Sequence, residues 1–155
     1  MDRAPGAITV AQSVPELQFL AFQDPQGFND PCDPVGGGRR AIAPGADAIV
    51  AYFRQLPGFT VDSVTEQRVD GHRAVRLVVH ANADASCPDG RLAEWQPKAV
   101  TNDLHWFLRP GDFDSLVIVE LPDSTVMFEV LPAPHALEDQ IIGSVRFLDR
   151  LPTTP

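Results

Sequence analysis

Two cysteines are the residues whose types and settings most directly suggest chemistry. Cys32 and Cys87 each lie in a turn-rich acidic segment, "NDPCDP" and "DASCPDG". Neighbouring carboxylates disfavour a thiolate, so they would raise the pKa of an exposed thiol there and weaken it as a nucleophile. Free structural cysteines usually lie in apolar surroundings instead. We therefore predict a Cys32–Cys87 disulfide, with two unrelated free thiols as the alternative.

The cellular compartment follows from this pairing. A bridge across so long a loop would contribute about 4 kcal/mol to stability in the chain-entropy model, and disulfides persist in oxidising compartments. The N-terminus, Met1-Asp2-Arg3 followed by Ala-Pro-Gly, does not resemble a signal peptide. Either the protein is cytosolic, or the sequence is a piece of a longer exported protein. The cysteines favour the second alternative and an extracytoplasmic location.

Four aspartates near the cysteines form a weak candidate metal site. The predicted bridge would gather them, and calcium prefers oxygen-rich, flexible sites. Aspartates in turns, however, more often accept local backbone hydrogen bonds. A hydrophobic content of 44% is enough for a core, so we expect folding to need no metal or organic cofactor. The four residues are Asp30, Asp33, Asp84 and Asp89.

No catalytic signature is present in the sequence. No serine lies in a Gly-x-Ser-x-Gly motif, and no two histidines have the short spacing of metal ligands. A small hydrolase that pairs a histidine such as His105 with an acidic residue is the enzymatic alternative, because triads are defined by geometry rather than sequence position. We expect a protein that is not an enzyme.

The charge balance argues against nucleic acid as a partner. The formal charge is −9, with 12 basic residues against 21 acidic ones, and Lys98 is the single lysine. Phosphate binding needs clustered positive charge, whereas the densest basic pair, Arg39 and Arg40, follows three glycines. No apolar stretch approaches the roughly 18 residues of a membrane span.

The apolar periodicity predicts strands and two helices. "GADAIVAYFRQLPG" has helical spacing, with Asp47 as a candidate N-terminal cap. A β-hairpin is expected at Asp70-Gly71, with Val75, Leu77 and Val79 facing the core. "LHWFLR", "SLVIVELP" and "STVMFEVLP" predict an antiparallel meander, and "ITVAQSVPELQFLAFQD" one or two further strands.

A second helix is predicted after Pro134, where apolar residues recur at intervals of three and four. This order predicts a single α+β domain over residues 8–150, with an antiparallel sheet and two main helices. The segments 1–7 and 151–155 are expected to be flexible tails.

The segment 82–103 is too polar for an ordinary core element, and we expect a long loop covering one end of the sheet. Cys87 would tie it covalently and Trp95 would anchor it. Loops on a rigid sheet often carry binding residues, so this loop is the expected recognition region. Alternatively, Trp95 only fills the core.

Several motifs together resemble a family of actinobacterial extracytoplasmic domains. They are "FNDPCDP", one helix, "VDGHRAVRL", a second cysteine followed by "EW", "RPGDFDSLVIVEL" and "IIGSVRF", spread over about residues 19–148. The resemblance implies a PsbP- and LpqN-lipoprotein-like α/β/α sandwich, attachment to a transmembrane segment, Cys32 and Cys87 as the bridged pair, and Trp95 as a buried loop aromatic. The family's biochemical role is undefined. Ala74, where the family often has glycine, and Leu116-Val117-Ile118, where it has a Leu-Trp-Ile pattern, mark a divergent relative.

These observations lead to three functional hypotheses. The first is a non-enzymatic extracytoplasmic domain, tethered to a membrane in its native context, that binds a small molecule or a protein. The second is the small hydrolase with a His/Asp pair, and the third is a cytosolic domain with two free thiols. Convergence of a histidine, a nucleophile and a carboxylate in one cleft would favour the enzyme, whereas an apolar groove or an exposed hydrophobic patch would favour binding.

Overall fold

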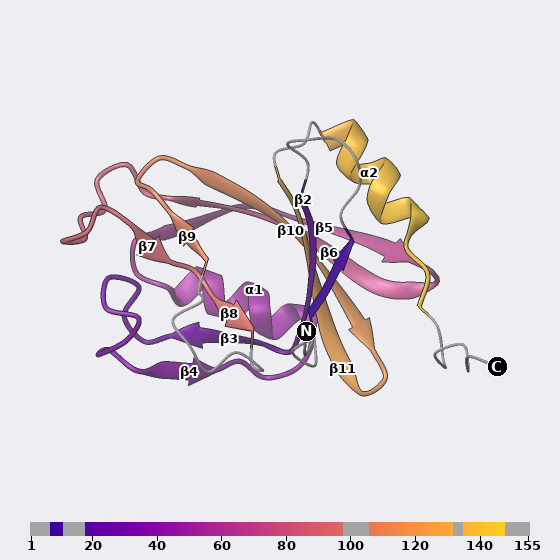
Figure 1. Ribbon diagram of the computed structural model, residues 1–155, viewed down its shortest axis with the longest axis horizontal. Coiled ribbons are helices and arrows are strands. Elements are labelled where there is room, and N and C mark those ends of the chain that lie inside the picture. The colour runs from indigo at the N-terminus through magenta and orange to yellow at the C-terminus, as the bar shows by residue number, and fades with distance from the viewer. Residues whose placement is uncertain (1–6, 11–17, 98–105, 132–134, 148–155) are drawn as a thin grey trace.

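A six-stranded antiparallel sheet forms the centre of the molecule (Figure 1). The structure is a computed structural model that describes residues 7–10, 18–97, 106–131 and 135–147. The strand order is β1-β2-β11-β10-β6-β5. The bounds are Ala7–Val10 for β1, Gln18–Gln23 for β2, Phe59–Val69 for β5, His72–Ala81 for β6, Phe113–Leu121 for β10 and Ser124–Leu131 for β11. The prediction of an α+β domain is confirmed.

Two tight hairpins build the half of the sheet that was most predictable. β5 and β6 meet at Asp70 and Gly71, whose φ angles are 48° and 81°, as the Asp-Gly dipeptide predicts. β10 and β11 pair from Leu116↔Glu129 to Leu121↔Ser124. On β6, Val75, Leu77 and Val79 are fully buried on one face, as expected from the alternation.

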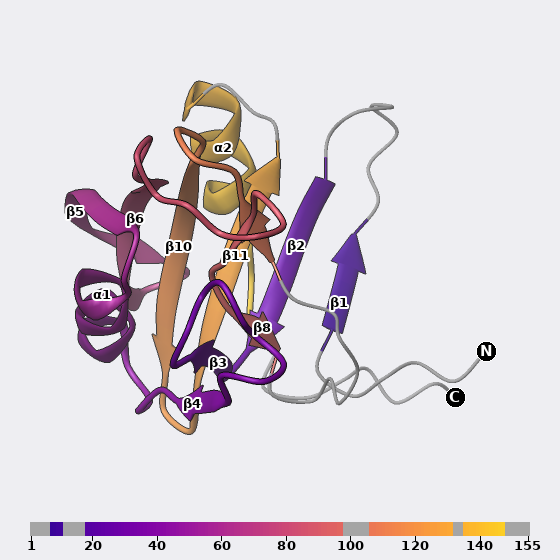
Figure 2. The same ribbon diagram turned by 90° about the vertical axis from the view of Figure 1, so that its left-hand side faces the viewer.

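One helix covers each face of the sheet (Figure 2). Helix α1 (Ala46–Gln55) buries Ile49, Val50 and Phe53 against the first face. Helix α2 (His135–Ser144) packs Ile142 against the second face, which also contains Phe128. Both helices lie where the sequence predicts them. In the described residues, no helix is long and apolar enough to cross a bilayer.

The N-terminus of α1 differs from the expectation. The capping residue is Gly45, and Asp47 lies in the first turn, where it forms an ion pair with Arg73. The Ala46 N–H donates instead to Glu120 Oε1 at 2.8 Å. Asp47 as the cap was therefore a wrong prediction, because a carboxylate from β10 satisfies this backbone donor.

A second layer of short strands lies over the first face. It contains β3 (Pro25–Phe28), β4 (Arg39–Ala41) and β8 (Gln96–Pro97) in the order β4-β3-β8, and a separate pair of β7 (Leu92–Ala93) with β9 (Phe107–Leu108). The predicted meander is thus only partly correct, because β9 pairs with β7 instead of β10. The segment 82–103, predicted to be a loop too polar for a core element, contains β7 and β8, and its residues 92–96 are buried. Residues 98–103 lie outside the described part.

Tyr52 fastens this second layer to α1. Its hydroxyl donates to Glu94 O at 2.6 Å and accepts from Phe28 N–H at 2.9 Å. A side chain at Gly27 would lie 2.2 Å from the Tyr52 ring, so glycine is required at this position. Burial raises the pKa of the Tyr52 hydroxyl well above its usual value, which keeps it a donor.

Candidate functional site

The predicted disulfide between Cys32 and Cys87 is present, with a Cα–Cα distance of 5.0 Å. It joins the segment after β3 to the segment before β7, and Cys87 is buried against the main core. Beside it, the Ala93 N–H donates to Pro31 O at 2.8 Å. One covalent bond and one hydrogen bond therefore hold these two segments together.

Three of the four aspartates near the bridge accept hydrogen bonds from the backbone of local turns. Asp30 Oδ1 accepts from Cys32 N–H at 2.8 Å, and Asp33 Oδ1 accepts from Gly36 N–H at 2.7 Å. Asp89 accepts from Arg91 N–H at 3.1 Å, and Asp84 is exposed. No group of three potential metal ligands is brought together in the described residues. The structure therefore does not gather this set into a calcium site.

Trp95 lies in an aromatic cluster with Phe22 and Trp106. It is 0% exposed, its ring stacks on Trp106 at a centroid distance of 4.8 Å, and Phe22 packs edge-on against both indoles. This burial is the arrangement of a core anchor. A ligand-stacking role would require the indole to become accessible.

Three carboxyl groups are buried on the first face of the sheet, beneath the second layer. Asp114 of β10 and Glu129 of β11 share the face of Leu116 because of the strand register, and Glu94 comes from the segment between β7 and β8. Each is at most 2% exposed. We call Glu94, Asp114 and Glu129 the acidic cluster. The sequence did not suggest it as a site.

The contacts of the acidic cluster favour a retained proton. Asp114 Oδ1 accepts from Ser115 N–H at 2.7 Å, and Glu129 accepts from the Trp106 side chain. Glu94 Oε1, Asp114 Oδ2 and Glu129 Oε2 lack an ordinary donor. The Asp114 and Glu129 carboxyl groups interact with each other, and burial of two neighbouring carboxyl groups favours protonation of at least one of them.

Burial is the main cause of the perturbed acidity in this cluster. It raises the pKa of Asp114 to about 6. Burial together with the charge of Asp114 raises the pKa of Glu129 to about 9, and burial raises the pKa of Glu94 well above its usual range. At neutral pH the cluster therefore holds protons, because no cation in it offsets the cost of burying several negative charges.

A histidine–carboxylate pair lies elsewhere, at the sheet edge. His80 Nδ1 and Asp62 Oδ1 are 2.8 Å apart, beside the bulge between Val61 and Ser63 in β5. In the described part of the chain, no hydrogen bond joins this pair to a hydroxyl or a thiol. His105, the histidine named for the hydrolase alternative, lies outside the described residues.

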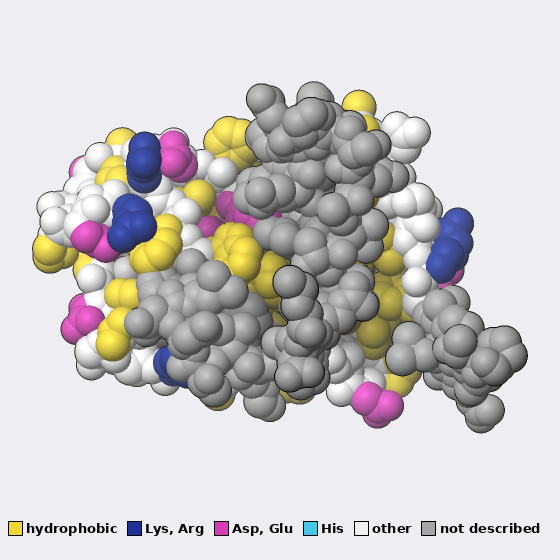
Figure 3. Space-filling view, viewed as in Figure 1, with side chains coloured by type: hydrophobic (Ala, Val, Ile, Leu, Met, Phe, Trp, Pro, Cys, Tyr) yellow, Lys and Arg dark blue, Asp and Glu magenta, His cyan; other side chains and the backbone are white. Residues whose placement is uncertain are grey.

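Among the described residues on the face drawn in Figure 3, basic side chains lie beside acidic and apolar ones. Arg40 of β4 donates a hydrogen bond to Gln55 of α1. Near α1, Arg73 is paired with Asp47, Glu66 and Glu120. On the second face of the sheet, Arg76 forms ion pairs with Glu138 and Asp139 of α2.

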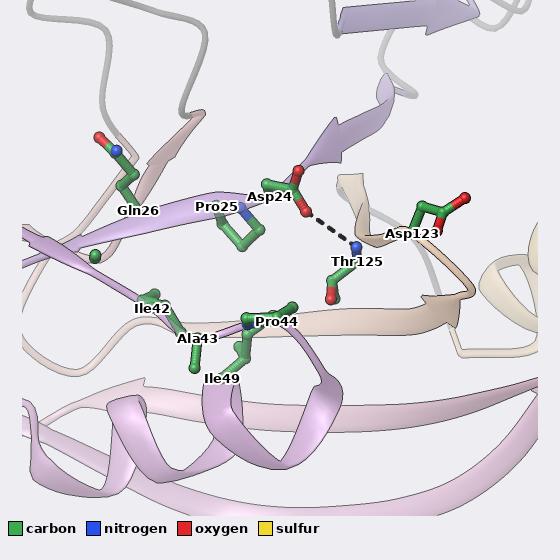
Figure 4. A pocket seen from close by; sticks show the side chains of 10 residues that line it. Asp24, Pro25, Gln26, Ile42, Ala43, Pro44, Ile49, Asp123 and Thr125 are labelled. Atoms are coloured by element: carbon green, nitrogen blue, oxygen red, sulfur yellow. Dashed lines mark hydrogen bonds between the residues drawn. The ribbon is translucent and has the colours of Figure 1, made fainter.

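An open pocket of about 210 Å³ lies where the second layer meets the start of α1 and the β10–β11 turn (Figure 4). We call it the β2–β3 pocket, after the junction that forms one of its walls. Residues before and within α1 form its apolar side. Residues of the β2–β3 junction and of the β10–β11 turn form its polar side. The lining residues are Asp24, Pro25, Gln26, Ala41, Ile42, Ala43, Pro44, Ile49, Asp123 and Thr125.

Thr125 connects the three segments that form this pocket. Its N–H donates to Asp24 Oδ1 at 3.1 Å, and its carbonyl accepts from Asp24 N–H at 2.8 Å. Its hydroxyl accepts from Gly45 N–H at 2.7 Å. Asp24 itself has a φ of 47°, a left-handed conformation that aspartate tolerates better than most residues. Thr125 therefore binds both the backbone of Asp24 and one oxygen of its carboxylate.

Comparisons with known proteins give little further information. No protein-family model matches the chain, and no curated protein does. Among solved structures, it is similar to the crystal structure of a protein of unknown function from Pseudomonas aeruginosa. The sequence identity is 16% and the TM-score 0.49, over 97% of this chain and 87% of the other. This likeness indicates no function.

Proposed function

We propose that this chain is a non-enzymatic extracytoplasmic domain that binds a small molecule or a protein partner, with the β2–β3 pocket as its ligand site. We also propose that a membrane tether accompanies it in its native context and that its fold is of the PsbP and LpqN-lipoprotein type. The placement of one helix on each face of the sheet is compatible with that α/β/α arrangement.

The Cys32–Cys87 disulfide is the observation that carries the extracytoplasmic part of the proposal. Both half-cystines lie in segments with little regular structure, and the bond ties the second layer together. A reducing cytosol would break this bond, and the two segments with little regular structure would lose their covalent connection.

The binding part of the proposal is supported by the preformed β2–β3 pocket. Its walls are held by hydrogen bonds among Asp24, Gly45 and Thr125, so a ligand need not order them on binding. Preorganised walls reduce the entropic cost of association. Mixed apolar and polar lining is also the usual composition of small-molecule sites.

The compartment is tested on protein taken from its native host. Cells are treated with a membrane-impermeant alkylating reagent, lysed in the presence of a second reagent, and the cysteine peptides are mapped without reduction. We expect a Cys32–Cys87 cross-linked peptide and recovery of the protein in the cell-envelope fraction. Recovery of both cysteines as alkylated thiols in the cytosolic fraction would contradict the proposal and favour the cytosolic alternative.

Ligand occupancy is tested by native mass spectrometry of the same material. We expect a species heavier than the chain alone, whose extra mass is lost on mild activation. The fraction of protein that carries this extra mass should be lower in a pocket-filling Ala43→Leu variant. An Ala83→Leu variant is the control, because Ala83 is also exposed but does not line the pocket. A bound mass unaffected by Ala43→Leu would place the ligand elsewhere.

A further inference from the structure

The β2–β3 pocket combines an acidic rim with an apolar wall, and this combination identifies a class of ligand. We infer that the pocket binds an alkyl cation, meaning an ammonium or guanidinium group on a short hydrocarbon chain. The inference rests on the proposed binding function and adds the chemistry of what is bound.

The charge of the lining selects the sign of the ligand. Asp24 and Asp123 are both carboxylates, and none of the ten lining residues is a lysine, arginine or histidine. Asp123 is exposed and Asp24 half-buried, so both carboxyl groups have access to water. A chain with a net charge of −9 also attracts cations to its surface.

The nearby helix terminus does not reverse this preference. The N-terminus of α1 is the one element of the pocket that could attract an anion. Its first donors are already occupied, because Gly45 N–H donates to Thr125 Oγ1 and Ala46 N–H donates to Glu120 Oε1. An anion would therefore meet two carboxylates without gaining these donors.

Asp24 retains hydrogen-bonding capacity for a ligand. Thr125 N–H donates to its Oδ1, and an ionised carboxylate has about four acceptor sites. A guanidinium or ammonium group donates several hydrogen bonds and accepts none, so it can use the remaining sites. Figure 4 shows Asp24 and Asp123 at the side of the pocket formed by the two turns, opposite Ile42 and Pro44.

The size and the opposite wall limit the rest of the ligand. A volume of about 210 Å³ is below the roughly 300–1,000 Å³ of pockets that enclose drug-sized ligands. Ile42 and Pro44, which are not buried, offer apolar contacts to a few methylene groups. One lysine or arginine side chain of a peptide, or a small free amine of the same chemistry, meets both requirements.

The experiment is a titration of ¹⁵N-labelled protein followed by amide chemical shifts. The probes are n-butylguanidinium and n-butylammonium, with 1-butanol and butyrate as matched neutral and anionic probes. We expect saturable shifts of pocket amides such as Gly45 and Thr125 with the two cations. Butanol and butyrate should bind at least about tenfold more weakly, as expected from loss of charge-assisted hydrogen bonds.

Variants assign the effect to the two carboxylates. Asp24→Asn with Asp123→Asn should weaken binding of the cations at least about tenfold, and Asp84→Asn, an exposed carboxylate outside the pocket, should leave it unchanged. If the double variant does not fold, Asp123→Asn alone and a salt titration give the same information, because cation binding should weaken as salt rises. Equal binding of butanol and butylammonium, or no shifts in the pocket, would overturn the inference.

The two possible sources of the cation are separated by a second titration. A tetrapeptide Ala-Arg-Ala-Ala, acetylated and amidated at its ends, is compared with n-propylguanidinium, a free alkyl guanidinium that carries the same single charge. Tighter binding of the peptide, with shifts extending to residues around the rim, indicates a protein partner, and tighter binding of n-propylguanidinium indicates a free alkyl cation. If neither binds while a native ligand is still found by mass spectrometry, this inference is wrong but the proposed binding function survives.

Discussion

Raising the pH is expected to destabilise the folded domain, because folding buries the three carboxyl groups of the acidic cluster. Burial raises the pKa of Asp114 to about 6 and that of Glu129 to about 9. In the unfolded chain these groups titrate near their ordinary values of about 4. Between the pKa values of the unfolded chain and those of the folded chain, the folded state therefore binds more protons than the unfolded state. The free energy of unfolding falls as the pH rises through this range.

The magnitude follows from the number of extra protons bound on folding. Each carboxyl that is protonated in the folded chain and ionised in the unfolded chain changes the free energy of unfolding by about 1.4 kcal/mol per pH unit. For Glu129 alone, the loss between about pH 5 and pH 7 is about 3 kcal/mol. The contribution of the protonated carboxyl groups to stability is complete below the pKa values of the unfolded chain and is lost as the pH rises to the pKa values of the folded chain. This loss is a large part of the roughly 5–15 kcal/mol of a typical domain.

A Glu129→Gln variant tests the origin of this dependence. Glutamine has nearly the same shape, can still accept from Trp106, and carries no charge. We expect the variant to be more stable than the parent by about 2–3 kcal/mol at pH 7 and to approach it at pH 5. Glu66→Gln is the control, because Glu66 is exposed and paired with Arg73. Its stability profile should parallel that of the parent.

The assay is urea unfolding at several pH values between about 5 and 8, followed by the fluorescence of Trp95 and Trp106. Equal unfolding free energies of the parent across that range would refute the reasoning, since they would mean that folding binds no extra protons. A Glu129→Gln profile that ran parallel to that of the parent would show that the protons are held elsewhere.

Three further perturbations probe the elements that hold the second layer in place. Trp95→Ala should lower the unfolding free energy by about 3–5 kcal/mol, measured by urea unfolding, whereas Val35→Ala, at a side chain that is 70% exposed, should stay within about 0.5 kcal/mol. Reduction of the Cys32–Cys87 bridge, which spans 55 residues, should cost about 4 kcal/mol, and an unchanged melting temperature in reductant would contradict this. Gly27→Ala should cost about 1–3 kcal/mol by displacing Tyr52; Gly143→Ala in α2, where an added Cβ meets nothing within 4 Å, should be neutral or slightly stabilising.

The parts of the fold that the sequence predicts are those built from neighbouring residues. Helix α1, the β5–β6 hairpin and the β10–β11 hairpin each depend on a local period or a turn dipeptide. Strands β3, β4, β7, β8 and β9 contain two to four residues each. Their pairing is decided by contacts between distant segments, such as Gln26 with Gln96. No local period indicates a partner at that separation.

Two residues of the acidic cluster could have been recognised from the sequence by their position in the strand alternation, although charged residues are not usually expected in a core. Asp114 has the same strand parity as Leu116 and Ile118, and Glu129 has the same parity as Met127. On a sheet these residues share a face, so each carboxyl falls on a core position. Glu94 gave no comparable signal, because its burial depends on the position of the second layer. A carboxyl on the core parity of a strand is thus a reason to expect a perturbed pKa.

The β2–β3 pocket could not be predicted, because its walls meet through contacts between segments that are separated in the sequence, such as the pairing of Gln26 with Ala41 and the hydrogen bonds of Thr125. This residue bonds to Asp24 through its backbone and to Gly45 through its hydroxyl, yet it reads in the sequence as an ordinary strand residue. These bonds hold the Asp24 backbone and one oxygen of its carboxylate in the absence of a ligand. A cation therefore meets a rim that is already in place, and its affinity depends on charge and fit more than on closure of a loop. Recognition at this pocket is consequently expected to be sensitive to salt and insensitive to changes in the acidic cluster, which belongs to a different part of the same face.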